Sequence, residues 1–94
     1  MTATEVRDVI AIVAANPELG DLIQGTGGVR KLRFAVGGRG KSGGVRVVYY
    51  YHNDSMPVFL LTVFAKNEKA NLTRAERNAL AKVARSLRDG YGAR

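Results

Sequence analysis

The chain has 94 residues, 46% of them hydrophobic, which favours one domain over residues 1–94 with one modest core. Lys and Arg total 15 against 8 Asp and Glu, and the net charge of +7 favours a polyanionic partner: nucleic acid, an acidic protein or a membrane surface. The absence of cysteine excludes disulfides and thiolate metal sites, and with only one histidine we expect neither a metal nor another cofactor. The sequence shows neither a signal-peptide pattern nor an apolar run near the ~20 residues of a membrane span, so we expect a cytoplasmic protein.

A first helix is predicted at the N-terminus. Thr2 and Glu5 have the spacing of a capping box, and Asn16-Pro17 ends the helix. Apolar residues recur between them at intervals of three and four, namely Val6, Val9, Ile10 and Val13. Residues 19–28 are rich in glycine and turn formers, so we expect a connection there.

Three strands are predicted in the middle of the chain. Residues 29–36 alternate in character, which places Leu32 and Phe34 on a core face and Lys31 and Arg33 on a basic face. Residues 45–52 are rich in β-branched and aromatic side chains, and residues 58–65 form a nearly continuous apolar run that we expect to be the most deeply buried strand. Short connections join the three into an antiparallel meander.

A second helix is predicted after Leu72, because Thr73 and Glu76 repeat the capping-box spacing. Its apolar stripe ends before Asp89-Gly90, a candidate C-cap. The opposite side carries five cations, which we interpret as a solvated surface: Arg74, Arg77, Lys82, Arg85 and Arg88. The expected fold class is therefore α+β, a small antiparallel meander of about three main strands packed against an N-terminal and a C-terminal helix.

The segment from residue 22 to 53 contains no Asp or Glu, yet it holds six cations: Arg30, Lys31, Arg33, Arg39, Lys41 and Arg46. On a hairpin, Lys31, Arg33 and Arg46 would share one face and could converge on one phosphate. The alternative is that basic side chains only keep an exposed sheet soluble. The lack of balancing acids and the glycine-rich loop that carries Arg39 and Lys41 favour phosphate binding, and both interpretations stay open.

Other residues offer further chemistry. Tyr50 shares its parity with Arg46 and is a candidate for stacking on a base, whereas Tyr49 and Tyr51 are expected in the core. Lys66, at the exit of the third predicted strand, either reaches the edge of the site or extends along apolar surface into water. His52 has no orienting carboxylate in the sequence nearby, so we interpret it as a surface residue.

Several motifs occur in the order and spacing of a known family. They are Asn-Pro after a helix, LGDLIQGTGGVRKLR, a loop of Gly, Lys and Arg, GGVRVVYYY, and LLTVFAKNEKANLT. Over residues 2–83 the chain resembles the RelE superfamily of toxin–antitoxin toxins, in its HigB-like branch. The resemblance implies a RelE-like α+β fold, a ribosome-dependent mRNA endonuclease (an mRNA interferase) that inhibits translation, and a cognate antitoxin, expected to be a helix-turn-helix DNA-binding protein.

The resemblance also implies roles for individual residues. Arg46, Arg33, Lys31 and Lys66 match basic positions of the family's site and are the expected catalytic residues, with Arg46 stabilising the transition state. Arg30, Arg39, Lys41 and Tyr50 are the expected RNA-binding residues. Asn67 stands where some relatives have another arginine, and the tyrosine that some relatives carry after the last central strand is missing.

Members of this family usually have an additional strand and helix before the segment that begins here at Thr2, and we expect this chain to lack them. Without them a sheet edge would stay uncovered, which predicts reduced stability, a homodimer through that edge, or a strand captured from a partner. The alternative function is a non-catalytic or degenerate toxin-family protein that binds an antitoxin or an acidic protein target such as gyrase.

Overall fold

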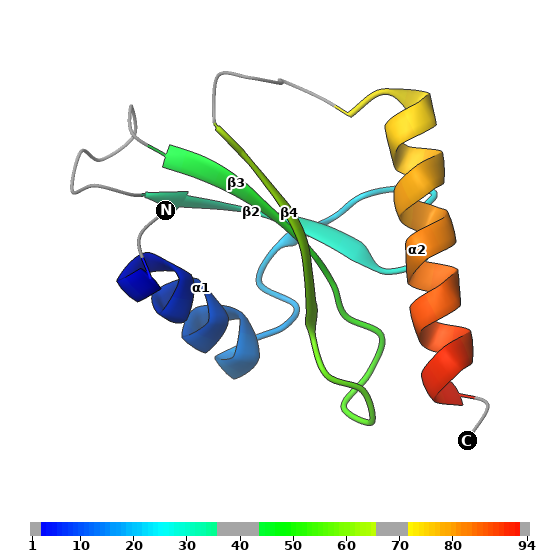
Figure 1. The fold of residues 1–94 in the computed structure, drawn as a ribbon, viewed down its shortest axis with the longest axis horizontal. Helices are drawn as coiled ribbons and strands as arrows, with labels where there is room; N and C mark the ends of the chain where they lie inside the picture. The colour runs from blue at the N-terminus through cyan, green and yellow to red at the C-terminus, as the bar shows by residue number, and fades with distance from the viewer. Residues whose placement is uncertain (1–2, 36–43, 66–71, 93–94) are drawn as a thin grey trace.

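The computed structural model describes residues 3–35, 44–65 and 72–92 of the chain (Figure 1). Within these residues, two helices and four strands follow one another in the order α1 (Ala3–Ala15), β1 (Asp21–Leu22), β2 (Val29–Ala35), β3 (Gly44–Tyr50), β4 (Phe59–Ala65) and α2 (Arg74–Gly92). The fold is α+β, as the sequence predicts. Neither helix combines the length and the apolar character that crossing a membrane requires.

The four strands form one antiparallel sheet in the order β1-β2-β3-β4. The predicted meander is confirmed as β2, β3 and β4. Residues 19–28 are more than a connection, because Asp21 and Leu22 pair with Lys31 and Arg30 as a two-residue strand. A strand this short is hard to recognise in a glycine-rich segment, since period-two alternation needs about four residues to appear.

The expectation that residues 58–65 form the most deeply buried strand is wrong. β4 lies at the outer edge of the sheet, and Leu60 and Val63 are 39% and 45% exposed. The central strand β3 takes that place, with Val47, Val48, Tyr49 and Tyr50 at most 1% exposed. An apolar run indicates burial of a strand but not whether a neighbouring strand covers both of its edges.

α1 covers one face of the sheet. Its residues Val9 and Val13, each 1% exposed, form a core cluster with Val47 and Tyr49 of β3. The amide of Asn16 still bonds to the carbonyl of Ile12, and the helix ends there, before Pro17, as predicted. The capping role of Thr2 lies outside the described residues.

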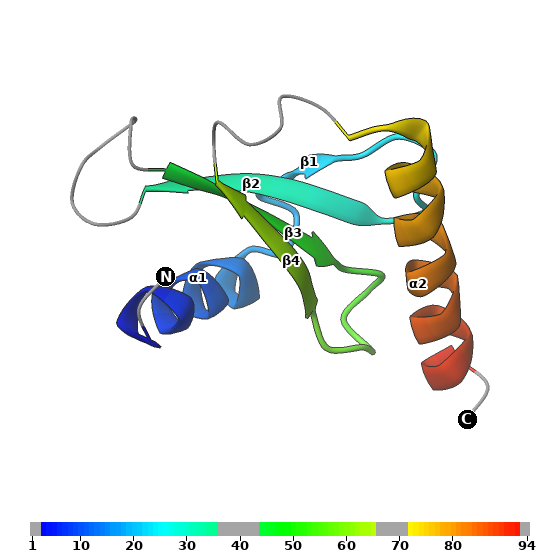
Figure 2. The same cartoon turned by 45° about the horizontal axis from the view of Figure 1, so that its top comes forward.

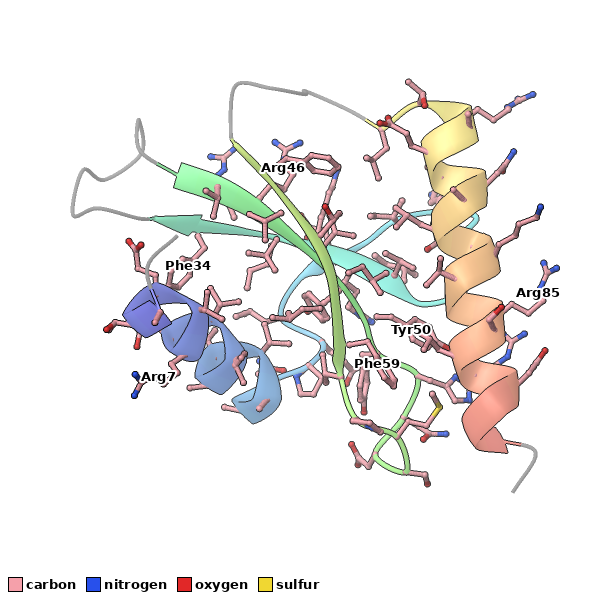
Figure 3. All side chains as sticks on the ribbon, in the orientation of Figure 1. Arg7, Phe34, Arg46, Tyr50, Phe59 and Arg85 are labelled. Carbon is pink, nitrogen blue, oxygen red and sulfur yellow. The ribbon has the colours of Figure 1, made fainter. Side chains whose placement is uncertain are left out.

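α2 covers the opposite face, so the sheet lies between the two helices (Figures 1 and 2). The predicted capping box is confirmed: the amide of Thr73 donates to Glu76 Oε1 at 2.8 Å, and the amide of Glu76 donates to Thr73 Oγ1 at 3.1 Å. The C-cap predicted at Gly90 is wrong, because α2 continues to Gly92. Arg85 points away from the sheet, in agreement with a solvated side of the helix (Figure 3).

The segment between α1 and β2 is tied to the sheet by Tyr49. Its buried hydroxyl donates to the carbonyl of Pro17 at 2.7 Å and accepts the amide of Gly20 at 2.9 Å. A Cβ at Gly20 would lie 2.8 Å from that hydroxyl, so only glycine lets the chain approach so closely. In the following turn, Thr26 is 2% exposed and its hydroxyl donates to the carbonyl of Ile23 at 2.6 Å.

Candidate nucleic-acid interface

A row of basic side chains crosses β2 and β3 on the face that α2 covers elsewhere. Arg33 and Arg46 are directly opposite each other in the antiparallel register, and Lys31 is opposite Val48. Opposite residues project to the same face, which confirms that Lys31, Arg33 and Arg46 share one face. Arg33 is exposed, while Lys31 and Arg46 are partly exposed.

The basic row is open because α2 crosses the other end of this face. Val29, Val48 and Tyr50 project to the same side as Arg46, yet they are at most 1% exposed and pack against α2. Figure 3 shows the separation directly, with Arg46 toward one end of the sheet and Tyr50 beside α2. The face is therefore divided into an apolar half under α2 and a basic half beyond it.

The electrostatic character of the basic half follows from the strands themselves. β2, β3 and β4 contain no acidic residue, so no carboxylate from these strands neutralises the row. Opposite Cα atoms lie about 5 Å apart in an antiparallel pair, which lets two guanidinium groups reach one phosphate. This arrangement suits binding and charge stabilisation of a phosphate.

Arg30 does not belong to this row, and its role in RNA binding stays a prediction. Neighbouring residues of a strand face opposite sides, so Arg30 lies on the α1 side of β2. Its side chain is 19% exposed, donates to the carbonyl of Gly20 at 2.8 Å and lies 3.9 Å from the carboxylate of Glu18. Arg30 instead holds the segment that precedes β1.

Tyr50 does share the face of Arg46, as its parity predicts, but it is 0% exposed and belongs to the core under α2. Its ring offers no open face for a base, so the predicted stacking role is wrong. Burial raises the pKa of the Tyr50 hydroxyl, an effect that Arg88 opposes and Asp89 reinforces. Tyr49, on the other face, is also fully buried, as predicted.

Three predicted site residues, Arg39, Lys41 and Lys66, lie outside the described residues, and their roles stay predictions. His52 is exposed, as expected of a surface residue. Over residues 3–35, 44–65 and 72–92, no group of three or more His, Cys, Asp or Glu side chains is placed to hold a metal ion.

The sequence interpretation missed Phe64 and Thr62 of β4. Phe64 lies opposite Arg46 and extends the arginine row onto a third strand, and Thr62 lies opposite Val48, in the next row, where the half under α2 begins. Nearly every residue of the run 58–65 is apolar, so the sequence predicts a core position for each and does not distinguish Phe64 from the others. The pairing also shifts by one residue between Val48 and Tyr49, a β-bulge that parity alone does not predict.

These observations define a small basic α+β protein whose sheet is covered by one helix on each face and presents opposed arginines beside its C-terminal helix. The family model of the RelE toxin of the RelE/RelB toxin–antitoxin system matches residues 4–91. The chain therefore belongs to the RelE toxin family and is a toxin of a toxin–antitoxin system, with an antitoxin as its partner. This confirms the resemblance at the level of the family, and the HigB-like branch stays a prediction.

Proposed function

We propose that this toxin is a metal-independent endoribonuclease that cleaves mRNA on the ribosome. The observation that supports the proposal is the pair of arginines, Arg33 and Arg46, directly opposite each other on an open part of the sheet. Membership of the RelE toxin family supports the same conclusion.

The proposed reaction needs no group beyond RNA and protein. The 2′-hydroxyl oxygen attacks the adjacent phosphorus as its proton is removed, and the bond from phosphorus to the 5′-oxygen breaks. That leaving oxygen takes up a proton, so a cyclic phosphate and a 5′-hydroxyl are formed. Negative charge accumulates on the non-bridging oxygens in the transition state, where Arg46 and Arg33 stabilise it.

Lys31, two residues from Arg33 along β2, binds the neighbouring phosphate. Lys66 is proposed to complete the basic site, and Arg39 and Lys41 to bind RNA alongside it.

Substitution of Arg46 tests this proposal. Loss of one charge-stabilising donor typically lowers a rate by about 10²- to 10³-fold, so we expect Arg46→Ala to abolish growth arrest and codon-positioned cuts in a translated message. Arg46→Lys keeps the charge but loses the two-pronged geometry, and it should retain part of the activity. Arg7→Ala is the matched control, because Arg7 is an exposed arginine of α1 (Figure 3).

Toeprinting on ribosomes and the denaturation midpoint of each variant are the measurements. Cleavage that persists unchanged in a folded Arg46→Ala protein would sink the assignment. Growth arrest with DNA damage and an uncut message would instead support binding of an acidic protein target such as gyrase.

The antitoxin is proposed to be a helix-turn-helix DNA-binding protein encoded beside the toxin. Co-expression of the two adjacent reading frames should restore growth and yield a complex on affinity purification. The complex should also retard a DNA fragment from its own promoter, and a neighbour without DNA-binding activity would contradict this part of the proposal.

A further inference from the structure

The basic half of the sheet does not end at β3. Two rows continue across the three strands: Arg33, Arg46 and Phe64 form the first, and Lys31, Val48 and Thr62 form the second, which borders the half under α2. The first row therefore places an aromatic ring on the strand next to a pair of arginines. RNA presents a complementary pair of groups: an anionic phosphate that can bind the arginines, next to a flat aromatic base that can stack on the ring.

Phe64 and Thr62 also line a pocket between β4 and α2. The other side of the pocket is formed by Glu76, Ala79, Leu80 and Val83 of α2 and by Leu72, which precedes the helix, and the volume is about 220 Å³. Pockets for drug-sized ligands are about 300–1,000 Å³, so this one has room for a single planar ring system. Its lining is almost entirely carbon, with Glu76 beside it already bonded to the Thr73 amide.

The walls of this pocket are exposed to solvent, unlike those of a gap inside the core. Val83, a large apolar residue on the pocket wall, is 44% exposed, and Ala79 is exposed as well. Ala84, one residue further on, is 1% exposed and belongs to the core, and Leu80 and Leu87 of the same helix pack against that core while staying partly exposed. The pocket is thus an apolar surface open to solvent beside a cationic row.

We propose that this pocket binds a nucleobase of RNA, in the nucleotide whose phosphate lies on Arg33 and Arg46. The inference rests on the proposed function, and it names how the same site recognises its substrate. Phe64 provides the stacking surface that the sequence assigned to Tyr50. Stacking in a carbon-lined pocket recognises a flat ring rather than a hydrogen-bond pattern, so every base binds and the larger purines bind more tightly.

Binding of small probes separates the base from the phosphate. Adenosine 5′-monophosphate, titrated into the protein, should shift the methyl NMR signals of Val83 and Leu80 upfield through the ring current of the base. Ribose 5-phosphate carries the phosphate without a base and should leave both signals in place. The methyl groups of Ile12, which is 39% exposed on α1, are the control and should not move with either probe.

Equal shifts with both probes, or no shift of Val83 at the highest soluble concentration of the nucleotide, would overturn the proposal. A shift of Ile12 similar to that of Val83 would show nonspecific adsorption and count against it too.

A filled pocket gives the second test. Ala79→Phe places a ring in the pocket from an exposed helix position, and Ala75→Phe makes the same change on an exposed position of α2 that does not line it. We expect Ala79→Phe to lower cleavage about tenfold and to abolish the nucleotide shift of Val83. Ala75→Phe should change neither.

The two proposals fail in different ways. If Arg46→Ala abolishes cleavage while Ala79→Phe changes neither cleavage nor nucleotide binding, the base pocket is wrong and the nuclease assignment stands. If Arg46→Ala leaves cleavage intact, the nuclease site is wrong whatever the pocket binds. Binding of ribose 5-phosphate is the control: if the Ala79→Phe variant still binds it, the fold and the phosphate site of the variant are intact.

Discussion

The two halves of one sheet face differ in what they contribute. Under α2, the face is formed by Val29, Val48 and Tyr50, all at most 1% exposed. Beyond α2, the same face carries Arg33 and Arg46 in contact with solvent. The apolar residues and the arginines lie on the same two strands, β2 and β3, and on the same face. The alternation of side chains along the strands therefore does not distinguish core residues from site residues. The path of α2 decides which residues form the core and which form the site.

This comparison separates stability from function. Each large apolar side chain buried under α2 contributes about 1.5–3 kcal/mol to folding. The opposed arginines contribute no such burial, and like charges directly opposite in a sheet destabilise it slightly. We therefore expect substitutions in the covered half to lower the free energy of unfolding, and those in the basic half to lower activity alone.

The largest effect is expected at Gly28, where the turn before β2 meets the covered half. Gly28 has φ +127°, and a Cβ there would lie 2.9 Å from Tyr50 Cε1 and 3.0 Å from the Tyr51 carbonyl oxygen. Gly28→Ala should lower the free energy of unfolding by about 3 kcal/mol or more. Gly25→Ala is the control, since Gly25 also has a positive φ, of 80°, but has no atom within 4 Å of its added Cβ.

Urea denaturation measures both variants. The backbone conformation alone should cost Gly25→Ala about 1 kcal/mol. Equal losses in the two variants would show that contact with Tyr50 adds nothing, and that the covered half is less tightly packed than described.

A second pair of variants compares the halves directly. Val48→Ala removes two buried methyl-sized groups and should lower the free energy of unfolding by roughly 2 kcal/mol. Arg33→Ala, at an exposed position of the basic half, should change it by less than about 0.5 kcal/mol while reducing RNA cleavage. If Arg33→Ala destabilises the protein as much as Val48→Ala, the division into a stabilising and a functional half is wrong.

The parts of the site that sequence predicted are those that depend on local geometry. Alternation placed Lys31, Arg33 and Arg46 on one face, and the register confirms it because β2 and β3 pair without a shift. The capping box at Thr73 and Glu76 is likewise set within one helical turn.

The predictions that failed depend on contacts between distant segments. Tyr50 projects to the same face as Arg46, and it is excluded from the site only because α2 covers it. The position of Arg30 depends on such a contact too, because its side chain donates to the Gly20 carbonyl ten residues away, while its role in RNA binding stays a prediction. Phe64 enters the first row through a register that contains a bulge, which the order of apolar residues does not reveal.

Tyr49 and Tyr50, adjacent on β3, face opposite helices and differ in the hydrogen bonds of their hydroxyl groups. Both are fully buried, but the Tyr49 hydroxyl makes two hydrogen bonds, whereas the Tyr50 hydroxyl has no partner among the described residues. Tyr49→Phe should lower the free energy of unfolding by about 1–2 kcal/mol, because it leaves the Pro17 carbonyl and the Gly20 amide unpaired.

Tyr50→Phe should leave stability unchanged or raise it by up to about 1 kcal/mol, since it removes a buried polar atom without breaking a bond. Thermal or urea unfolding of the two variants at neutral pH gives the comparison. A loss in Tyr50→Phe equal to that in Tyr49→Phe would mean that the Tyr50 hydroxyl is bonded in the folded protein.

The smallest expected effect is the dependence of stability on alkaline pH. Burial raises the pKa of Tyr50 above its ordinary value of 10.0, so the unfolded chain releases this proton at a lower pH than the folded protein. The stabilisation is fully present below pH 10 and is lost as pH rises toward the folded-state pKa. Tyr50→Phe should therefore lose less stability than the parent protein between pH 9 and about 11.

Tyr51→Phe is the control for this measurement. The pKa of Tyr51 is also raised, chiefly by its 2.8 Å hydrogen bond to Asp54, but this hydroxyl lies at the surface, where solvent weakens the effect on stability. We expect Tyr51→Phe to follow the parent's alkaline profile closely. If it flattens the profile as much as Tyr50→Phe does, ionisation at the surface rather than burial under α2 governs the alkaline loss, and the covered half is open to solvent.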